Sequence, residues 1–311
     1  MLHIFHSLLD LLLRRPNGHG GSRAEAGTTV GMKRRVPPSI PPAACPPADI
    51  PSPGRPRRGL AVWLAGSLSY DAYAAMAERL AWDVSEPSGR PPTLLLYELQ
   101  PEITLGRLGS RCDVELTDEE LQNHRLDVRF VGRGGGAVLH APGQIGVALF
   151  AKLEDLGLAP FAVGPYLDRF EVALEGAIRS LRCGAARDSH LPGIFGRTGL
   201  LAAVGIAVRR GVVSHGAFVN VSPALDLFHR VRSVGGAGAP RTAAGPTRSL
   251  LTMGSIEADV QRRVRVQDAR AALVEHCVEA FAFPSSHIQS GFPLPLRAPA
   301  DHPREFTRRV G

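Results

Sequence analysis

The sequence contains very little lysine. Of its 36 lysine and arginine residues only Lys33 and Lys152 are lysines, so any mechanism that needs an active-site lysine has two candidates along the chain. Aromatic residues are also sparse, at 6%. A core must therefore be built mainly from leucine, valine and alanine, and the hydrophobic content of 44% supports such a core. The length of 311 residues is sufficient for one large domain or two small ones.

Cysteine is equally scarce. The four cysteines are far apart and form no C-x-x-C pair: Cys45, Cys112, Cys183 and Cys277. This spacing argues against a zinc site and against a disulfide framework, and we expect no bound metal. Free thiols are typical of a reducing compartment, which favours a cytoplasmic location.

Long apolar runs are missing too. No stretch is long enough to span a bilayer, so we expect no membrane partner. The net charge of +7 would suit a nucleic-acid-binding protein. However, the arginines are scattered, aromatic residues are not interleaved with them, and part of the excess charge lies within residues 1–58. We therefore expect no nucleic-acid partner.

Proline-rich segments divide the chain. Residues 1–15 are apolar with two arginines at the end, which is compatible with a short amphipathic helix, a transit-like segment or an unstructured extension. Residues 16–58 are rich in proline, glycine and arginine and predict a disordered linker, because proline cannot sustain a helix or a paired strand. We expect a folded domain over residues 59–285 and a Pro-rich tail over residues 286–311.

Apolar periodicity predicts a mixture of strands and helices within that domain. Strands are expected over residues 59–64, 93–97, 103–107 and 126–131, with a hairpin over 202–209 and 212–221. Helices are expected from Ser69, from Thr117 as a cap, over residues 161–182 and over 267–281. Strands and helices do not alternate regularly, so we expect an α/β (α+β) fold with a mixed, largely antiparallel sheet flanked by helices.

Two glycine-containing segments are candidate ligand-binding elements. The first is RGGGAVLHAPGQ over residues 133–144, and the second is RRGVVSHGAFVNV over residues 209–221. Because glycine has no Cβ, its backbone can approach a ligand closely, and its N–H groups can bind a carbonyl oxygen or a phosphate. The alternative is a tight turn that binds nothing.

Together with LLLYELQPEITLGR over residues 94–107, these segments resemble the octanoyltransferase (LipB-like) family, part of the lipoyl/biotinyl protein ligase catalytic-domain superfamily. The resemblance covers roughly residues 59–285 and implies a lipoyl/biotinyl ligase-like fold. It also implies transfer of an octanoyl group from acyl carrier protein to a lysine of a lipoyl-domain protein, with no cofactor. The substrate-binding residues that it implies are Arg133, Gly134, Gly135, Gly136, His140, Gly143, Gln144, Ser214, His215, Gly216 and Asn220.

The two side chains that perform the chemistry in that family are absent from this sequence. In the family a cysteine thiolate attacks the thioester, and a lysine activates the thiol and the incoming amine. Leu200 stands at the lysine position, and Val234 stands at the cysteine position. The resemblance therefore predicts impaired or lost transfer, and we assign no catalytic residue.

Other interpretations remain open. The chain could be a non-catalytic module that binds an acyl group or its carrier. The glycine segment also resembles lipoate-protein ligases, which use ATP and no cysteine, although Leu200 again replaces their lysine. A lipoate- or biotin-protein ligase-like enzyme is therefore a further alternative. Two cysteines are candidate substitutes for the nucleophile: Cys112, which has basic neighbours, and Cys183, which follows a predicted helix and is better explained as a packed core thiol.

Overall fold

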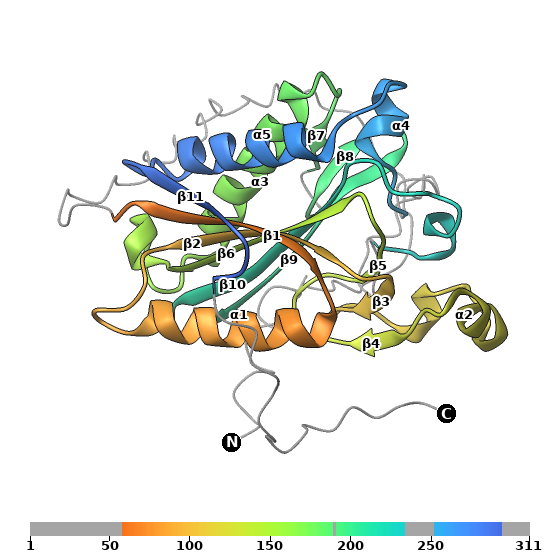
Figure 1. The fold of residues 1–311 in the computed structure, drawn as a ribbon, viewed down its shortest axis with the longest axis horizontal. Helices are drawn as coiled ribbons and strands as arrows, with labels where there is room; N and C mark the ends of the chain where they lie inside the picture. The colour runs from red at the N-terminus through yellow and green to blue at the C-terminus, as the bar shows by residue number, and fades with distance from the viewer. Residues whose placement is uncertain (1–57, 189–190, 234–251, 294–311) are drawn as a thin grey trace, which may run out of the picture. The chain divides into compact units, whose positions relative to one another are not determined.

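The fold is taken from a computed structural model that describes residues 58–188, 191–233 and 252–293. Within these ranges eight strands form one sheet in the order β11-β1-β2-β6-β10-β9-β8-β7, and three strands form a second sheet in the order β4-β3-β5 (Figure 1). The predicted segment 1–15, residues 16–57 of the predicted linker, the end of the predicted tail and Val234 lie outside the described residues.

The main sheet is mixed, as predicted. Strand β1 pairs in parallel with β2 and β11, and every other pairing in this sheet, within the described ranges, is antiparallel. Its strands are β1 (Leu60–Leu68), β2 (Thr93–Leu99), β6 (Gln144–Lys152), β7 (Ala186–Arg187), β8 (Ile194–Gly196), β9 (Gly199–Arg209), β10 (Val212–Asn220) and β11 (Ser286–Ser290). The second sheet contains β3 (Glu102–Leu105), β4 (Val128–Phe130) and β5 (Ala137–His140).

Helices cover both faces of the main sheet (Figure 1). Helix α1 (Tyr70–Ser85) packs on one face, and helices α3 (Val163–Ser180) and α5 (Val266–Ala280) pack together on the other. Because both faces are covered, the central strand β6 is buried from Gln144 to Ala151. No strand was predicted over these residues, which lack the alternation that identifies half-buried strands.

Local signals determine where several elements begin and turn. The predicted cap of helix α2 (Asp118–His124) is confirmed, because Thr117 and Glu120 form a reciprocal capping box. The predicted hairpin is confirmed as well: Arg210 and Gly211 connect β9 to β10 with φ angles of 51° and 76°. Positive φ at both central residues matches the right-handed twist of the flanking strands.

Two predictions need correction. We placed the tail from residue 286 onward, whereas Ser286–Ser290 form β11, which pairs in parallel with β1. The folded domain therefore extends at least to Ser290. The apolar periodicity that predicts the helix over residues 161–182 includes Val172, but this side chain is 46% exposed in α3. The described helices include none that is long and apolar enough to cross a membrane.

Candidate functional site

The glycine segment is held by backbone contacts with two other parts of the chain. The N–H of Gly134 donates to the carbonyl of Ile206 on β9 at 2.9 Å, and the N–H of Gly106 donates to the carbonyl of Gly136 at 3.1 Å. A Cβ on Gly106 would lie 2.4 Å from the carbonyl oxygen of Gly135. Gly135 has a φ of 77°. Glycine is therefore required here for close backbone packing, whether or not a ligand binds.

Arg133, which precedes the glycines, is a buried cation with 2% exposure. Its guanidinium donates to Thr104 Oγ1 at 2.8 Å, to the Thr104 carbonyl at 3.0 Å and to the Gly134 carbonyl at 3.0 Å. The guanidinium carbon lies 5.6 Å from the ring centre of Phe218, and three tyrosines lie near it: Tyr70, Tyr73 and Tyr97. Burial lowers the pKa of Arg133 to about 10. Its Nε has no hydrogen-bond partner among the described residues, so one buried donor remains available.

His140 lies at the end of β5 and is fully buried. Its Nδ1 lies 2.7 Å from Gln144 Oε1, which can only accept, so Nδ1 carries the proton. Nε2 then accepts from the hydroxyl of Thr104 at 2.8 Å. Burial lowers the pKa of His140 to about 3. The ring is consequently neutral at physiological pH and is a poor general base.

The network continues from β6 to β10. The Nε2 of Gln144 donates to the carbonyl of Leu139 at 2.9 Å and to Oδ1 of Asn220 at 2.8 Å. The Nδ2 of Asn220 donates to the carbonyl of Gly254 at 2.8 Å. The structure thus brings four of the predicted site residues into one buried network with Thr104: Arg133, His140, Gln144 and Asn220.

The second motif lies against helix α1. His215 has a φ of 61°, and its Nδ1 lies 2.9 Å from the hydroxyl of Tyr73. Burial is the main cause that lowers the pKa of His215 to about 4, with additional lowering by nearby arginines: Arg133, Arg209 and Arg107. His215 therefore lies close enough to Arg133 to be influenced by its charge. Residues of both glycine-containing segments thus lie near the same cation.

The neighbours of His215 have packing roles. The hydroxyl of Ser214 donates only to the carbonyl of Ala207 on β9, at 3.4 Å, among the bonds of the described residues. A Cβ on Gly216 would lie 1.9 Å from the carbonyl oxygen of Val147. Glycine therefore permits β10 to approach β6 at this position.

Leu200, at the start of β9, is buried in apolar surroundings with 1% exposure. It pairs with Phe195 on β8 and bridges to Met253 on its other side. A Cβ on Gly193 would lie 2.6 Å from Cδ1 of Leu200. The leucine side chain thus occupies space beside Gly193, in a position surrounded by hydrocarbon.

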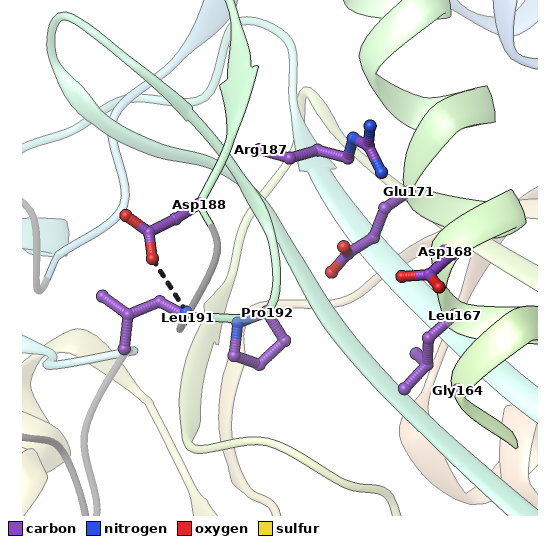
Figure 2. Close-up of a pocket in the computed structure, with 8 residues that line it drawn as sticks. All are labelled: Gly164, Leu167, Asp168, Glu171, Arg187, Asp188, Leu191 and Pro192. Carbon is purple, nitrogen blue, oxygen red and sulfur yellow. Dashed lines mark hydrogen bonds between the residues drawn. The ribbon is translucent and has the colours of Figure 1, made fainter. Parts of the chain in front are cut away.

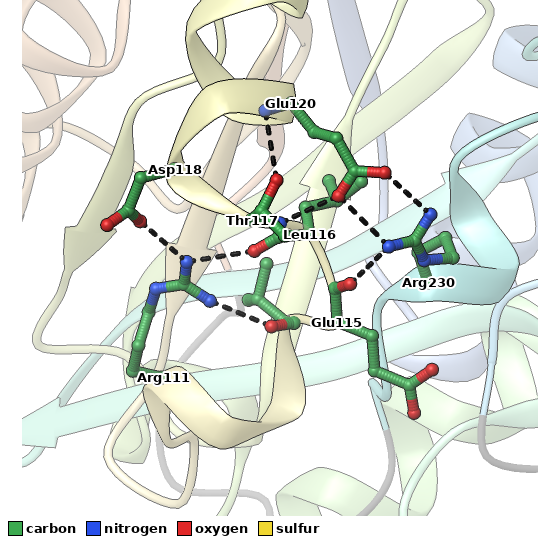
Figure 3. Close-up of polar contacts among 8 residues, drawn as sticks. Arg111, Glu115, Leu116, Thr117, Asp118, Glu120 and Arg230 are labelled. Carbon is green, nitrogen blue, oxygen red and sulfur yellow. Dashed lines mark hydrogen bonds and ion pairs between the residues drawn. The ribbon is translucent and has the colours of Figure 1, made fainter.

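The segment that leads to Val234 is anchored near Leu200. Arg232 bridges to Thr252, which is adjacent to the Met253 that pairs with Leu200. Upstream, Arg230 donates to both carboxylate oxygens of Glu120 at 3.1 Å and also to the Glu115 carbonyl (Figure 3). Val234 follows this anchored segment two residues after Arg232.

The three cysteines within the described ranges differ in access. Cys112 is exposed, and its carbonyl accepts a hydrogen bond from Arg232. Cys183 is buried 3.7 Å from Asp259 Oδ2, and burial raises the pKa of its thiol to about 11. Burial raises the pKa of Cys277 to about 12. Cys183 is therefore a packed core thiol, while Cys112 lies beside the segment that leads to Val234.

Two hollows in the described structure lie outside this network. A cavity of about 490 Å³ between α3 and the segment around β7 is lined by Asp168, Glu171, Arg187 and Asp188 among others (Figure 2). A groove of about 510 Å³ lies along α5 beside β1 and β11. None of the residues predicted for the site lines either hollow. No group of three His, Cys, Asp or Glu side chains in the described ranges could hold a metal ion.

Sequence reasoning missed several residues of the site. Thr104 joins Arg133 to His140, Tyr73 bonds to His215, and Glu98 accepts from the backbone N–H of Gly143 at 3.3 Å. Thr104 and Glu98 belong to the 94–107 segment that carried part of the family resemblance, and this was the available signal. Tyr73 lies in a helix whose pattern indicates only packing.

Comparisons with known proteins place this geometry in context. Residues 69–278 match the lipoyl protein ligase A/B catalytic domain. The chain is 31% identical over 206 residues to an octanoyltransferase from Geotalea uraniireducens, covering 66% of this chain and 86% of that protein. It is 32% identical over 208 residues to an octanoyltransferase from Geobacter sulfurreducens, covering 67% and 78% respectively.

Solved structures confirm the predicted fold. A bipartite lipoate protein ligase from Thermoplasma acidophilum aligns with a TM-score of 0.57 at 15% identity, covering 75% of this chain and 87% of that one. Lipoate-protein ligase A bound with ATP aligns with a TM-score of 0.56 at 16% identity, covering 75% and 89%. At these identities the likeness concerns the fold alone.

Proposed function

The chain belongs to the lipoyl protein ligase A/B catalytic domain family, and we propose that it is an octanoyltransferase homologue that binds an acyl group or its carrier but transfers the acyl group poorly or not at all. Octanoyl transfer is the activity for which its relatives from Geotalea uraniireducens and Geobacter sulfurreducens are named. The partners we propose are acyl carrier protein and lipoyl-domain proteins.

The observation that carries this proposal is the environment of Leu200. At the position of the family lysine the chain has a side chain that cannot move a proton, and hydrocarbon surrounds it on several sides. The change is consistent with its surroundings, because an ammonium group placed among these apolar side chains would lose its hydration. Val234, at the position of the nucleophile, cannot attack a carbonyl carbon.

The remaining site residues are suited to binding rather than to acid–base chemistry. Burial lowers the pKa values of His140 and His215 to about 3 and 4, so neither ring takes up a second proton and becomes an imidazolium near neutral pH. Efficient general bases have pKa values near the working pH. Arg133 supplies a buried positive charge and a free Nε donor, which favour a carbonyl oxygen or an anionic group of a ligand.

The proposal is tested by incubating the full chain with octanoyl-acyl carrier protein and measuring intact mass. We expect a complex with the carrier and no hydroxylamine-labile adduct. A labile adduct on the wild-type chain would refute the loss of the nucleophile, and the Cys112→Ser variant would then show whether Cys112 carries it. Acylation of a lipoyl domain that depends on ATP would instead select the ligase interpretation.

A rescue experiment tests the same idea from the opposite direction. The double variant Val234→Cys with Leu200→Lys should form the acyl adduct and modify a lipoyl domain, because it restores the thiol and the amine together. Each single variant serves as the control and should remain inactive. Circular dichroism of each variant shows whether a negative result reflects unfolding.

A further inference from the structure

We propose that Glu98 is a positioning residue, which holds the turn before β6 in place and is itself held by Arg270 of helix α5. One carboxylate oxygen of Glu98 accepts from the backbone N–H of Gly143 at 3.3 Å. The other accepts from Arg270 at 3.0 Å. A single side chain therefore connects α5 to the turn between His140 and Gln144.

The turn is constrained on both sides of Gly143. Its N–H reaches Glu98, while its carbonyl accepts from the backbone N–H groups of Val221 and Ser222, each at 3.1 Å. Gly143 has a φ of 87°, and a Cβ there would lie 2.8 Å from the carbonyl oxygen of Ser222. Only glycine fits this conformation, so the turn depends on backbone bonds and on Glu98 rather than on its own side chain.

Arg270 is buried, as expected for an arginine in a structural ion pair. It is 9% exposed, it donates to the carbonyl of Ala65 at 3.4 Å, and Glu98 is its one carboxylate partner among the described residues. A hydrogen bond of 3.3 Å from a peptide N–H is long, and it is effective mainly because the acceptor is charged. Arg270 keeps that charge at the turn instead of allowing the side chain to extend into water.

The position of this turn affects the buried network of the site. The turn at Gly143 determines where Gln144 begins β6, and the side chain of Gln144 holds both His140 and Asn220. Arg270 is 172 residues away from Glu98 in sequence. We infer that α5, which the family motifs do not include, sets the geometry of the network through this pair.

The test measures hydrogen exchange of the Gly143 amide by NMR in the full chain. Arg270→Met and Glu98→Gln should each accelerate exchange at Gly143 by about tenfold or more, because each weakens a charge-assisted bond. Amides of the β9–β10 hairpin should keep their wild-type rates. Arg270→Lys, which retains the positive charge, should recover most of the protection.

Arg265→Met is the matched control, since Arg265 is the N-cap of α5 and also pairs with a carboxylate, that of Asp268, but its side chain is 82% exposed. It should leave Gly143 unchanged. Unchanged exchange at Gly143 in both Glu98→Gln and Arg270→Met would overturn the proposal, as would a parallel acceleration of all amides, which would indicate general destabilisation. The measurement needs no acyl ligand, so its outcome is independent of the proposed function.

Discussion

Gln144 and Asn220 face each other across β6 and β10 in the backbone register, and their side chains are also bonded, with Nε2 of Gln144 at 2.8 Å from Oδ1 of Asn220. Both residues are buried. Gln144 continues the chain of hydrogen bonds to His140, and Asn220 continues it to Gly254. Because every member depends on its neighbour inside a low-dielectric core, loss of one partner should be costly.

Asn220→Leu is the direct test of that network. The substitution leaves the Nε2 proton of Gln144 and the carbonyl of Gly254 without this partner, and each buried unpaired group costs about 1–3 kcal/mol. We therefore expect the free energy of unfolding in urea to fall by roughly 2–6 kcal/mol. The exposed Asn123→Ala on α2 is the control and should change stability by less than about 0.5 kcal/mol. Equal stability losses in the two variants would contradict a cooperative network.

His140 should make the stability of the protein sensitive to acid. Burial lowers its pKa to about 3, whereas an unfolded histidine has a pKa of about 6.5. Below about pH 6.5 the unfolded chain therefore binds a proton that the folded chain does not, and stability falls as the pH decreases toward 3. Between about pH 7.5 and pH 5 this histidine alone should account for about 2 kcal/mol.

The measurement compares urea unfolding of wild type and His140→Gln at these two pH values. At the higher pH the variant is expected to be less stable than wild type, because it loses the bond network. On acidification, however, its free energy of unfolding should fall by about 2 kcal/mol less than that of wild type. Identical changes in the two proteins would show that His140 is accessible to protons in the folded state.

Elements of the fold that carry a local sequence signal were predicted, and elements that lack one were missed. Helix α2 and the β9–β10 hairpin were predicted correctly, because a capping box and a Gly-containing turn are local features. Strand β6 carries no alternation, because both its faces are buried, and its apolar run was not recognised, although the similar run of β2 was. Strand β11 was missed, because it is short, mostly exposed and recognisable only through its pairing with β1.

The same distinction applies to the site. Glycines and histidines in motifs could be identified from the sequence, and four of the predicted residues meet in one network. Their roles could not be predicted, since the low pKa of His140 depends on burial and its tautomer depends on Gln144. Thr104 and Glu98 act through contacts with residues 36 and 45 positions away, which no local pattern encodes.

The hairpin turn offers a stabilising change. Arg210 has a φ of 51°, a conformation that costs a side-chain-bearing residue energy but that asparagine tolerates better. Arg210→Asn creates an Asn-Gly turn and should stabilise the protein by about 0.5–1 kcal/mol. Gly211→Ala, at a φ of 76°, should destabilise it by a similar amount. Thermal unfolding of both variants checks the opposite signs, and a shift in the same direction would argue against this turn geometry.

Thiol reactivity should separate the cysteines. Cys112 is exposed and should react with Ellman's reagent in the native protein. Burial raises the pKa values of Cys183 and Cys277 to about 11 and 12, so both should react only after denaturation. Peptide mapping assigns each label, and Cys112→Ser should remove the rapid labelling of its own peptide. Rapid native labelling of Cys183 would contradict its assignment as a core thiol and make it a candidate nucleophile again.

Leu200→Lys tests whether position 200, which the family resemblance aligns with a lysine, accepts an amine. Cδ1 of Leu200 fills the space beside Gly193, and Met253 and Phe195 flank it. A lysine here must bury its ammonium or release a proton, so we expect a loss of about 3 kcal/mol in unfolding free energy, decreasing at high pH as the amine becomes neutral. Leu200→Met conserves volume and should cost less than about 1.5 kcal/mol. If the lysine variant is as stable as the methionine variant, polar or charged groups around position 200 still support an amine. That outcome would weaken the case for lost transfer.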